Sequence, residues 1–481
     1  MGSFRSHSKK AEIIIIKSFL FLLIQMQVVL ASPSVSNLIE PQECFGGRGS
    51  ELKKISNDLN RYKKSSLIGL SGIGKTQLSR MYAITNQERY DIIWFFDCNQ
   101  NLDRQFSQLA KEINAYLYKG NKILAEDSGA KNAVINHLKH KNKILLVFDN
   151  LKINQNKMVQ EFIDLEHNIH ILFSSQDANK LPHIVRLQNL SYKDTKEILD
   201  KILSELPEEE KVKLSNILKG YPILISQAAY LLNDNKHLTI EDYKKNFYGK
   251  ENIIDTNIKI ILQNLSRPTK ALLSKLIFID NTFSQDVINR INKGNNVNEI
   301  QELVRFGLIN YTNISNNKNF FEMHDTIKKS LIENTNQAHI ITTIESLIIS
   351  IHNSLPKRSL DRYKLFLENN TLLNSIEHLE QMAMNYNIDF FKTIVLTRHK
   401  LVFAVFSRDT LTLSKIQKLF KSVGKDHNDI KKNDILKRVS YSECIFFLGL
   451  DDFIFYGNVE DTKKKLELAK EIMATIKGFV A

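Results

Sequence analysis

The sequence predicts a multidomain protein in which an α/β domain with a parallel sheet is followed by helical domains. Three observations predict this fold class. Short apolar runs alternate with amphipathic segments over residues 40–188. A glycine-rich segment, LIGLSGIGKT at 67–76, joins one such run to a helical segment. Beyond residue 190 apolar residues recur mainly at helical spacing, and 481 residues are too many for a single core.

Composition limits the classes of function. The chain has 66 basic and 53 acidic residues, a net charge of +13, and the excess is spread over lysine-rich helix faces. This distribution favours a solvated basic surface over a nucleic-acid groove, so DNA is not an expected partner. Three distant cysteines, Cys44, Cys98 and Cys444, argue against a disulfide framework and a zinc site. We therefore expect the folded part in a reducing compartment, the cytoplasm.

Residues 1–36 differ from the rest. Basic residues precede the apolar stretch 13–31, which is interrupted by Lys17 and followed by small residues. This order is typical of a secretory signal peptide or a weak membrane anchor. An amphipathic helix, or a leader that is not part of the working protein, fits the same residues, because the stretch is short and charged for a membrane span.

The α/β domain is predicted over residues 40–188. Apolar runs predict strands at 66–70, 90–96, 144–148 and 169–175. Helical spacing predicts helices at 53–64, 77–83, 102–118 and 133–140. Nearly continuous apolar strands that alternate with helices indicate a parallel sheet covered on both faces.

The glycine-rich loop is the first candidate site. It has the pattern G-x-x-x-x-G-K-T, with Gly69, Gly72, Gly74, Lys75 and Thr76. The glycines permit backbone angles that bring several N–H groups close to a phosphate chain. Lys75 would lie near the β- and γ-phosphates, and Thr76 would bind Mg²⁺. The positive end of the following helix would face the same anion.

The second candidate site is the end of the run 144–148. This run ends in Asp149, which can hold Mg²⁺ through water or the loop threonine. Asn150 follows, and a neutral amide can orient a water molecule but cannot accept its proton. Glu51 and Asp97 are other acids in the domain, and nothing in their sequence positions favours either as a general base.

Two helical units are predicted after the α/β domain. Residues 189–250 form a small helical domain with helices at 193–203, 208–219 and 223–232, the first capped by Ser191 and the last opened by Pro222. Residues 255–336 contain helices at 258–265, 270–278, 285–291 and 298–305, a β-hairpin with strands at 307–312 and 319–323, and a helix at 326–333. Helices with a hairpin outline a winged-helix domain.

The region 340–481 contains no catalytic grouping. It predicts successive amphipathic helices at 341–355, 372–385, 390–407 and 412–423. Segments 441–449, 452–457 and 461–476 are similar to one tetratricopeptide unit, with Gly457 at the turn and Ala469 facing the partner helix. An unrelated helical bundle is the alternative, because one such unit cannot bury its faces alone. The abrupt end at Ala481 is also what a truncated repeat array would show.

Together these motifs resemble the NB-ARC group of STAND NTPases, the signal-transducing ATPases related to AAA+ proteins. The resemblance covers about residues 45–334. It rests on an entry motif at Phe45–Leu52, a Walker A loop at Gly69–Thr76, a Walker B motif at Leu145–Asn150, a G-x-P motif at Gly220–Pro222 and an MHD motif at Met323–Asp325.

The resemblance implies roles for individual residues. Pro222 would pack against adenine, and His324 would contact the β-phosphate of ADP and hold a closed state. ADP or ATP would be bound by Arg48, Gly69, Gly72, Ile73, Gly74, Lys75, Thr76, Gln77, Pro222 and His324. Asp149 and Asn150 would be the catalytic residues, and Thr76 and Asp149 would hold Mg²⁺.

The sequence departs from the family pattern at several positions. Gly46 and Gly49 replace a valine and a glutamate of the entry motif, which weakens the contacts inferred there. Asn150 replaces the second Walker B acid, and Gln176 replaces an arginine that senses the γ-phosphate. Nucleotide binding and exchange are therefore better supported than fast hydrolysis.

The sequence thus predicts an ADP/ATP-binding signal-transduction switch with slow or weak ATP hydrolysis. A protein or small-molecule inducer that binds the C-terminal helices would favour opening, nucleotide exchange and self-association. Two other classes remain open. One is an actively cycling ATPase of AAA+ type. The other is a transcriptional regulator or a scaffold that binds partners through its helical tail.

Overall fold

The computed structural model describes most of the chain from residue 33 onward. The described residues are 33–42, 44–99, 101–126, 129–152, 160–162, 169–235, 237–250, 252–312, 319–388, 390–407, 412–413, 416, 444–445 and 459–474. The apolar stretch 13–31 lies outside this range, as do about half of the tetratricopeptide-like segment, including Gly457, and most of the predicted helix 412–423. Within it, no helix combines the length and apolarity needed to cross a membrane.

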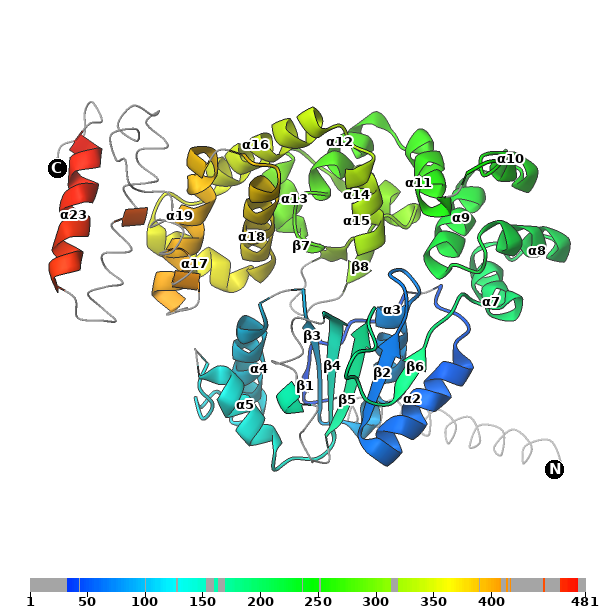
Figure 1. The fold of residues 1–481 in the computed structure, drawn as a ribbon, viewed down its shortest axis with the longest axis horizontal. Coiled ribbons are helices and arrows are strands. Elements are labelled where there is room, and N and C mark those ends of the chain that lie inside the picture. Colours follow the sequence, from blue (N-terminus) through cyan, green and yellow to red (C-terminus); the bar gives the residue numbers. More distant parts are fainter. Residues whose placement is uncertain are drawn as a thin grey trace, which may run out of the picture.

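A parallel sheet forms the lower body in Figure 1. Its six described strands follow the order β1-β3-β4-β5-β2-β6. They are β1 (Val35–Ser36), β2 (Lys64–Ile68), β3 (Ile92–Asp97), β4 (Ile144–Leu151), β5 (His170–Ser175) and β6 (Ile184–Arg186). The predicted parallel sheet is confirmed.

Both faces of the sheet are covered by helices, because alternate strand residues enter two separate cores. Leu67, Leu145 and Val147 pack with α2 (Gly49–Tyr62) and α3 (Lys75–Thr85). Trp94 and Phe148 pack on the other face with α4 (Leu102–Leu117) and α5 (Ala130–Leu138). The central strands β3, β4 and β5 are therefore largely apolar, as the sequence predicted.

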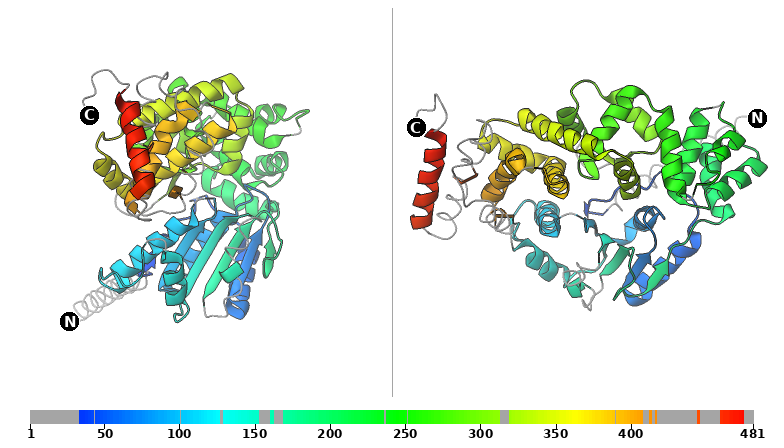
Figure 2. Two further views of the ribbon diagram at one scale, coloured as in Figure 1. Left: turned by 60° about the vertical axis from the view of Figure 1, so that its left-hand side comes forward. Right: turned by 45° about the horizontal axis from the view of Figure 1, so that its top comes forward.

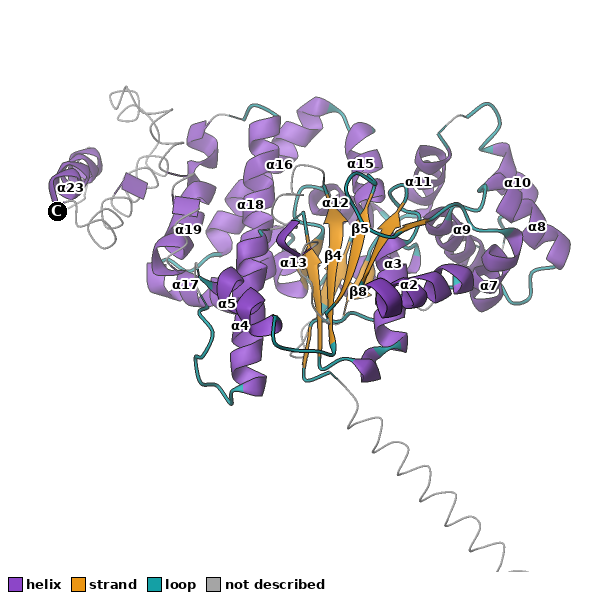
Figure 3. Ribbon diagram, turned by 60° about the horizontal axis from the view of Figure 1, so that its bottom comes forward, coloured by secondary structure: helices purple, strands orange, loops and turns teal. Residues whose placement is uncertain are grey.

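The helices after the sheet form an arch over the carboxyl ends of its strands (Figures 1 and 3). The first unit contains α7 (Tyr192–Ile202), α8 (Glu208–Ile217), α9 (Pro222–Asp234) and α10 (Ile240–Lys245). The Ser191 hydroxyl accepts a hydrogen bond from the Asp194 backbone N–H, and Pro222 is the first residue of α9. The predicted cap and helix start are both confirmed.

The second unit combines helices with a small antiparallel sheet. Its helices are α11 (Ile253–Asn264), α12 (Arg267–Leu276), α13 (Gln285–Ile291), α14 (Val297–Arg305) and α15 (Asp325–Glu333). Its strands are β7 (Thr282–Ser284), β8 (Asn310–Thr312) and β9 (Phe320–Glu322), in the order β7-β9-β8. The predicted hairpin is present as β8 and β9. The strand β7 was not predicted.

The described C-terminal helices complete the arch. They are α16 (Gln337–Ser354), α17 (Ser359–Glu368), α18 (Asn370–Asn385), α19 (Phe390–Ser407) and α23 (Val459–Ala474). The sequence prediction missed α17. It also placed residues up to 36 in the leader, whereas Val35 and Ser36 form the strand β1 beside β3.

Helix α18 contacts both the sheet domain and the second helical unit. An Arg104 guanidinium nitrogen on α4 lies 2.9 Å from a Glu377 carboxylate oxygen, and the Arg104 guanidinium also lies over the Phe403 ring. The next residue, His378, accepts a hydrogen bond of 3.0 Å from Lys328 on α15. Figure 2 shows the C-terminal helices beside the α4 and α5 end of the sheet body. One helix thus contacts both the sheet domain and α15.

The contact between Lys328 and His378 predicts a pH dependence of stability. Burial, followed by the charge of Lys328, lowers the pKa of His378 to about 3. The unfolded histidine, with a pKa of about 6.5, therefore binds more protons than the folded one as the pH falls. His378 thus contributes stability above about pH 6.5 that is lost toward lower pH. In His378→Gln, melting temperature should fall less between about pH 7.5 and pH 5 than in the wild type.

An exposed histidine supplies the control for this measurement. His339 lies on the exposed side of α16, and His339→Gln should leave the pH dependence of the melting temperature unchanged. Equal falls in the wild type and in His378→Gln would contradict the assignment.

Candidate functional site

The glycine-rich loop connects the end of β2 to the start of α3. Gly72 and Gly74 have φ angles of 79° and 96°, which side chains with a Cβ rarely adopt. A Cβ on Gly72 would also lie 3.1 Å from the Tyr221 side chain. Helix α3 begins at Lys75, with Gly74 as its N-cap. The loop thus presents the positive end of a helix to one point, where an anion is stabilised.

Lys75 holds this loop in shape. Its Nζ donates hydrogen bonds of 2.9 Å to the carbonyl oxygens of Gly69 and Leu70. The residue is only 7 % exposed, and burial lowers the pKa of its ammonium group while the carboxylates of Asp149 and Asp325 oppose that shift. A poorly hydrated cation in this position has a strong electrostatic attraction for a phosphate.

The predicted Mg²⁺ ligands lie next to each other. The Thr76 hydroxyl donates a hydrogen bond of 2.7 Å to Asp149, and Ser174 donates another to the same carboxylate. Ser174 reaches it because β5 lies between β2 and β4. Within the described residues no group of three or more acids, histidines or cysteines could hold a metal. Thr76 and Asp149 therefore fit Mg²⁺ only together with phosphate and water oxygens, its usual arrangement with nucleotides.

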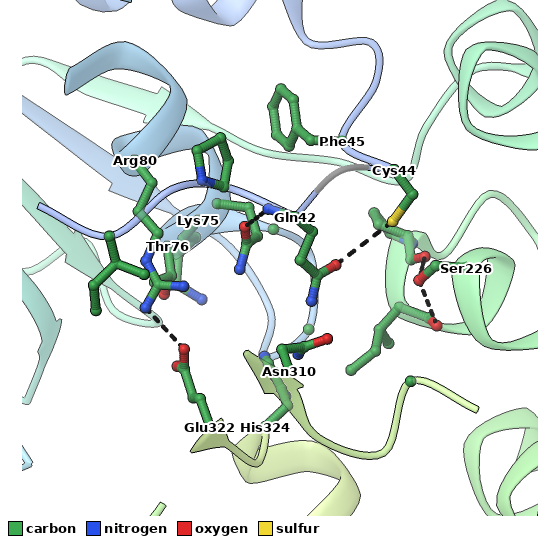
Figure 4. Close-up of a pocket in the computed structure, with 18 of the residues that line it drawn as sticks. Gln42, Cys44, Phe45, Lys75, Thr76, Arg80, Ser226, Asn310, Glu322 and His324 are labelled. Atoms are coloured by element: carbon green, nitrogen blue, oxygen red, sulfur yellow. Dashed lines mark hydrogen bonds and ion pairs between the residues drawn. The ribbon is translucent and has the colours of Figure 1, made fainter. Parts of the chain in front are cut away.

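A cavity of about 540 Å³ opens beside the loop, a size suited to a small-molecule ligand. It lies between the sheet domain and both helical units, and Figure 4 shows side chains from all three around it. The predicted site residues among those that line it are Arg48, Gly72, Ile73, Gly74, Lys75, Thr76, Gln77, Asn150, Pro222 and His324. Gly69 and Asp149 lie behind this lining, in contact with Lys75 and Thr76.

The first helical unit closes the apolar side of the cavity. Pro222 lines it together with Phe45, Leu190 and Ile198. Tyr221 precedes Pro222 and donates a hydrogen bond through its hydroxyl to the Ser71 carbonyl of the loop. An apolar wall beside an anion-binding loop suits a ligand that joins a flat base to phosphates.

His324 enters the cavity from the second unit. It is the N-cap of α15, where its Nδ1 accepts a hydrogen bond of 3.1 Å from the Thr326 N–H. Burial lowers its pKa, which favours the neutral ring. Because Nδ1 accepts, the proton of this neutral ring lies on Nε2, where it can be donated to a phosphate oxygen.

The loop is also the point where the three units meet. The Thr326 hydroxyl donates a hydrogen bond of 2.8 Å to the Ser71 hydroxyl, while Tyr221 bonds the carbonyl of the same residue. Arg80 on α3 forms an ion pair of 2.8 Å with Glu322 at the end of β9. No local sequence pattern indicates these contacts, because they join residues at least 150 positions apart.

Arg48 has a different setting from the one that the resemblance implies. Its guanidinium is 2.8 Å from a Glu51 oxygen and donates to the carbonyls of Ile73 and Gln188 at 3.1 and 2.6 Å. It therefore supports the loop through the Ile73 carbonyl and also lines the cavity. Glu51 is engaged by this pair, so the structure does not favour it as a general base.

Asp97 is a cavity residue for which the sequence offered no support. It ends β3 directly beside Asp149 on β4 and lines the cavity. Burial, together with neighbouring carboxylates such as that of Asp149, raises its pKa to about 7. The rule that parallel strands bring their carboxyl ends to one edge of the sheet could have indicated Asp97.

Asn150 has a φ of 58°, and its backbone N–H donates a hydrogen bond of 3.1 Å to the Ser174 hydroxyl.

Comparisons with known proteins identify the fold. No protein-family model matches the chain. No curated protein matches it by sequence. Among solved structures it resembles a Signal Transduction ATPase with Numerous Domains (STAND) protein with a tetratricopeptide repeat sensor from Pyrococcus horikoshii. The TM-score is 0.54 at 15 % identity, over 91 % of this chain and 66 % of that one.

Two further structures are more distant. A Walker-type ATPase of Pyrococcus abyssi has a TM-score of 0.34 at 13 % identity, over 60 % of this chain and 95 % of that one. Cdc6p from Pyrobaculum aerophilum has a TM-score of 0.32 at 14 % identity, over 61 % and 96 %. These scores are too low to support an argument. The first likeness establishes the fold, a P-loop sheet domain with a helical region.

Proposed function

We propose that this chain is a nucleotide-controlled switch of the P-loop NTPase class, similar to the NB-ARC proteins. The observation that carries the proposal is the single cavity that the phosphate loop, Pro222 and His324 line together. These residues come from three units, so one ligand in this cavity would contact all three. A nucleotide has the required parts, since a base suits the apolar wall and phosphates suit the loop.

In the proposed diphosphate form the three units are closed around ADP. The loop N–H groups and Lys75 bind the phosphates, Pro222 packs against the base, and His324 donates its Nε2 proton to the β-phosphate. Bound Mg²⁺ would neutralise phosphate charge beside Thr76 and Asp149. The unit that carries His324 is then held to the sheet domain partly through the nucleotide.

Hydrolysis is proposed to be slow. Asn150 stands at the position next to Asp149, and its amide cannot accept a proton from an attacking water molecule. Gln176, directly after β5, is neutral and adds no charge to the transition state. A steady-state turnover as fast as that of cycling AAA+ enzymes would instead favour an active motor.

Regulation is proposed to act through the C-terminal helices. A protein or small molecule that binds them would favour an open form, in which nucleotide exchanges and chains associate. Such a ligand can shift the equilibrium only by its difference in affinity for the two forms. By linkage, the same ligand must weaken ADP binding by an equal factor.

The nucleotide content of the purified full-length chain tests this proposal. Denaturation should release close to one ADP per chain, identified by chromatography and mass. A chain that carries no nucleotide and takes up neither ADP nor ATP would overturn the proposal, and the helical tail would become the place to look for function.

The hydrogen bond from Tyr221 to Ser71 should slow nucleotide release. Tyr221→Phe removes a bond of about 1 kcal/mol between α9 and the loop, so ADP should dissociate about fivefold faster. Stopped-flow measurement with a fluorescent ADP derivative gives this rate. Tyr192→Phe, which removes a hydroxyl bonded to exposed Glu208, is the matched control and should leave the rate unchanged. Equal rates in Tyr221→Phe and the wild type would show that the bond does not retain the ligand.

A further inference from the structure

The cavity lining contains few positive charges for a triphosphate. Among the described residues that line it, the basic side chains with a permanent charge are Arg48, Lys75 and Arg80. Acidic side chains also line it, at Glu40, Asp97, Glu322 and Asp325. A γ-phosphate would add negative charge to the cavity, and Glu322 and Asp325 of the second helical unit would repel it.

Two of the three cations are already committed. Arg48 bonds to Glu51 and to two backbone carbonyls behind the loop. Lys75 belongs to the loop itself and serves the phosphates of a diphosphate as well as those of a triphosphate. Gln176, directly after β5, is neutral. Arg80 is therefore the remaining cation that could respond to the third phosphate.

Arg80 is placed for this task. It follows Thr76 by one helical turn on α3, so both side chains lie on the same face of the helix. Its side chain is nine-tenths buried, and in Figure 4 it extends beside Thr76 toward Glu322. A guanidinium in such a setting can bind either a carboxylate or a phosphate through paired N–H groups.

We propose that Arg80 distinguishes ATP from ADP in this cavity, and that Glu322 competes with the γ-phosphate for its guanidinium. The inference rests on the nucleotide-binding function proposed above. With a diphosphate, Arg80 stays on Glu322 and ties β9, with His324 two residues later, to α3. With a triphosphate, Arg80 turns to the γ-phosphate, and Glu322 is left beside a second negative charge. The repulsion between them favours movement of β9 away from the loop.

Affinities of single and double variants test the competition. The full-length chain, stripped of nucleotide, is titrated with Mg-ADP and with the Mg complex of β,γ-imido ATP, which resists hydrolysis. The readout is the ratio of the triphosphate affinity to the diphosphate affinity. Arg80→Gln should lower this ratio about tenfold, because it removes the cation that binds the third phosphate. Glu322→Gln should raise it about fivefold, because Arg80 is freed.

The double variant shows whether Glu322 competes with the γ-phosphate for Arg80 or whether the ion pair only joins two units. In Arg80→Gln/Glu322→Gln the ratio should match that of Arg80→Gln, since freeing an absent guanidinium has no effect. If the pair only joined two units, both single variants would change the ratio in the same direction, and the inference would be wrong. If Arg80→Gln does not fold, Arg80→Lys replaces it and should lower the ratio less.

A second ion pair supplies the matched control. Arg104 and Glu377 also join the sheet domain to the helical arch, at a comparable distance of 2.9 Å. Arg104→Gln and Glu377→Gln should leave the ratio unchanged. A change as large as in the Arg80 variants would overturn the inference, because any tie between units would then have the effect. A wild-type chain that binds neither nucleotide would instead refute the proposed function itself.

Discussion

Replacing Lys75 by alanine is expected to lower the affinity for both ADP and ATP by at least about a hundredfold. The ammonium group is buried beside the loop, where water competes weakly with a phosphate for its charge. The substitution also releases the carbonyls of Gly69 and Leu70 that Lys75 holds. Nucleotide released on denaturation, and titration of the stripped variant, both measure the loss.

The exposed Lys111 on α4 is the control for this variant. Lys111→Ala removes an equal charge far from the loop and should bind nucleotide as the wild type does. Melting temperature shows whether Lys75→Ala is folded. Nucleotide content equal to the wild type in a folded Lys75→Ala protein would refute the placement of the phosphates at this loop.

His324→Ala is the variant with the second largest expected effect. It removes both the proposed donor to the β-phosphate and the N-cap of α15, which stabilises the helix by about 1 kcal/mol. ADP affinity should fall by roughly tenfold or more, because a hydrogen bond to a charged phosphate is lost. The population should shift toward the open form, seen as a lower ADP content and a larger hydrodynamic radius.

His324→Asn separates the two roles of this residue. Asparagine is a good N-cap but is too short to put a donor where Nε2 lies. The variant should recover the stability of α15 and still bind ADP weakly. Full recovery of ADP binding in His324→Asn would show that the cap alone matters, and retention of ADP by His324→Ala would contradict both roles.

Much of the fold followed from local patterns. The strands β3, β4 and β5 are largely apolar runs between helical segments, and β2 leads into the glycine-rich loop, so their type and parallel pairing could be predicted. The strands β1, β6 and β7 have two or three residues each and too few alternating positions for a pattern. They exist because a neighbouring strand supplies their hydrogen bonds, which is a tertiary effect.

Some residues of the candidate site could likewise be predicted from local sequence patterns, and others could not. Lys75, Thr76 and Asp149 stand at fixed places relative to a strand end, and the structure brings Thr76 and Asp149 within 2.7 Å. Pro222 and His324 were placed only by their family resemblance, and both line the cavity. Arg80 and Glu322 carry no local signal. Their pairing depends on how two units dock, which spacing along the chain does not encode.

The order of strands in the sheet has a consequence for synthesis of the protein. The strand β2, which leads into the phosphate loop, is flanked by β5 and β6, and both come about 100 residues or more later in the chain. At a translation rate of about 5–20 residues per second, β2 waits several seconds on the ribosome without either neighbour. During this time β2 exposes Leu67 and Ile68, which are buried in the folded protein, and leaves its backbone groups unpaired. The nascent chain therefore needs chaperones to shield β2 until residue 186 has emerged.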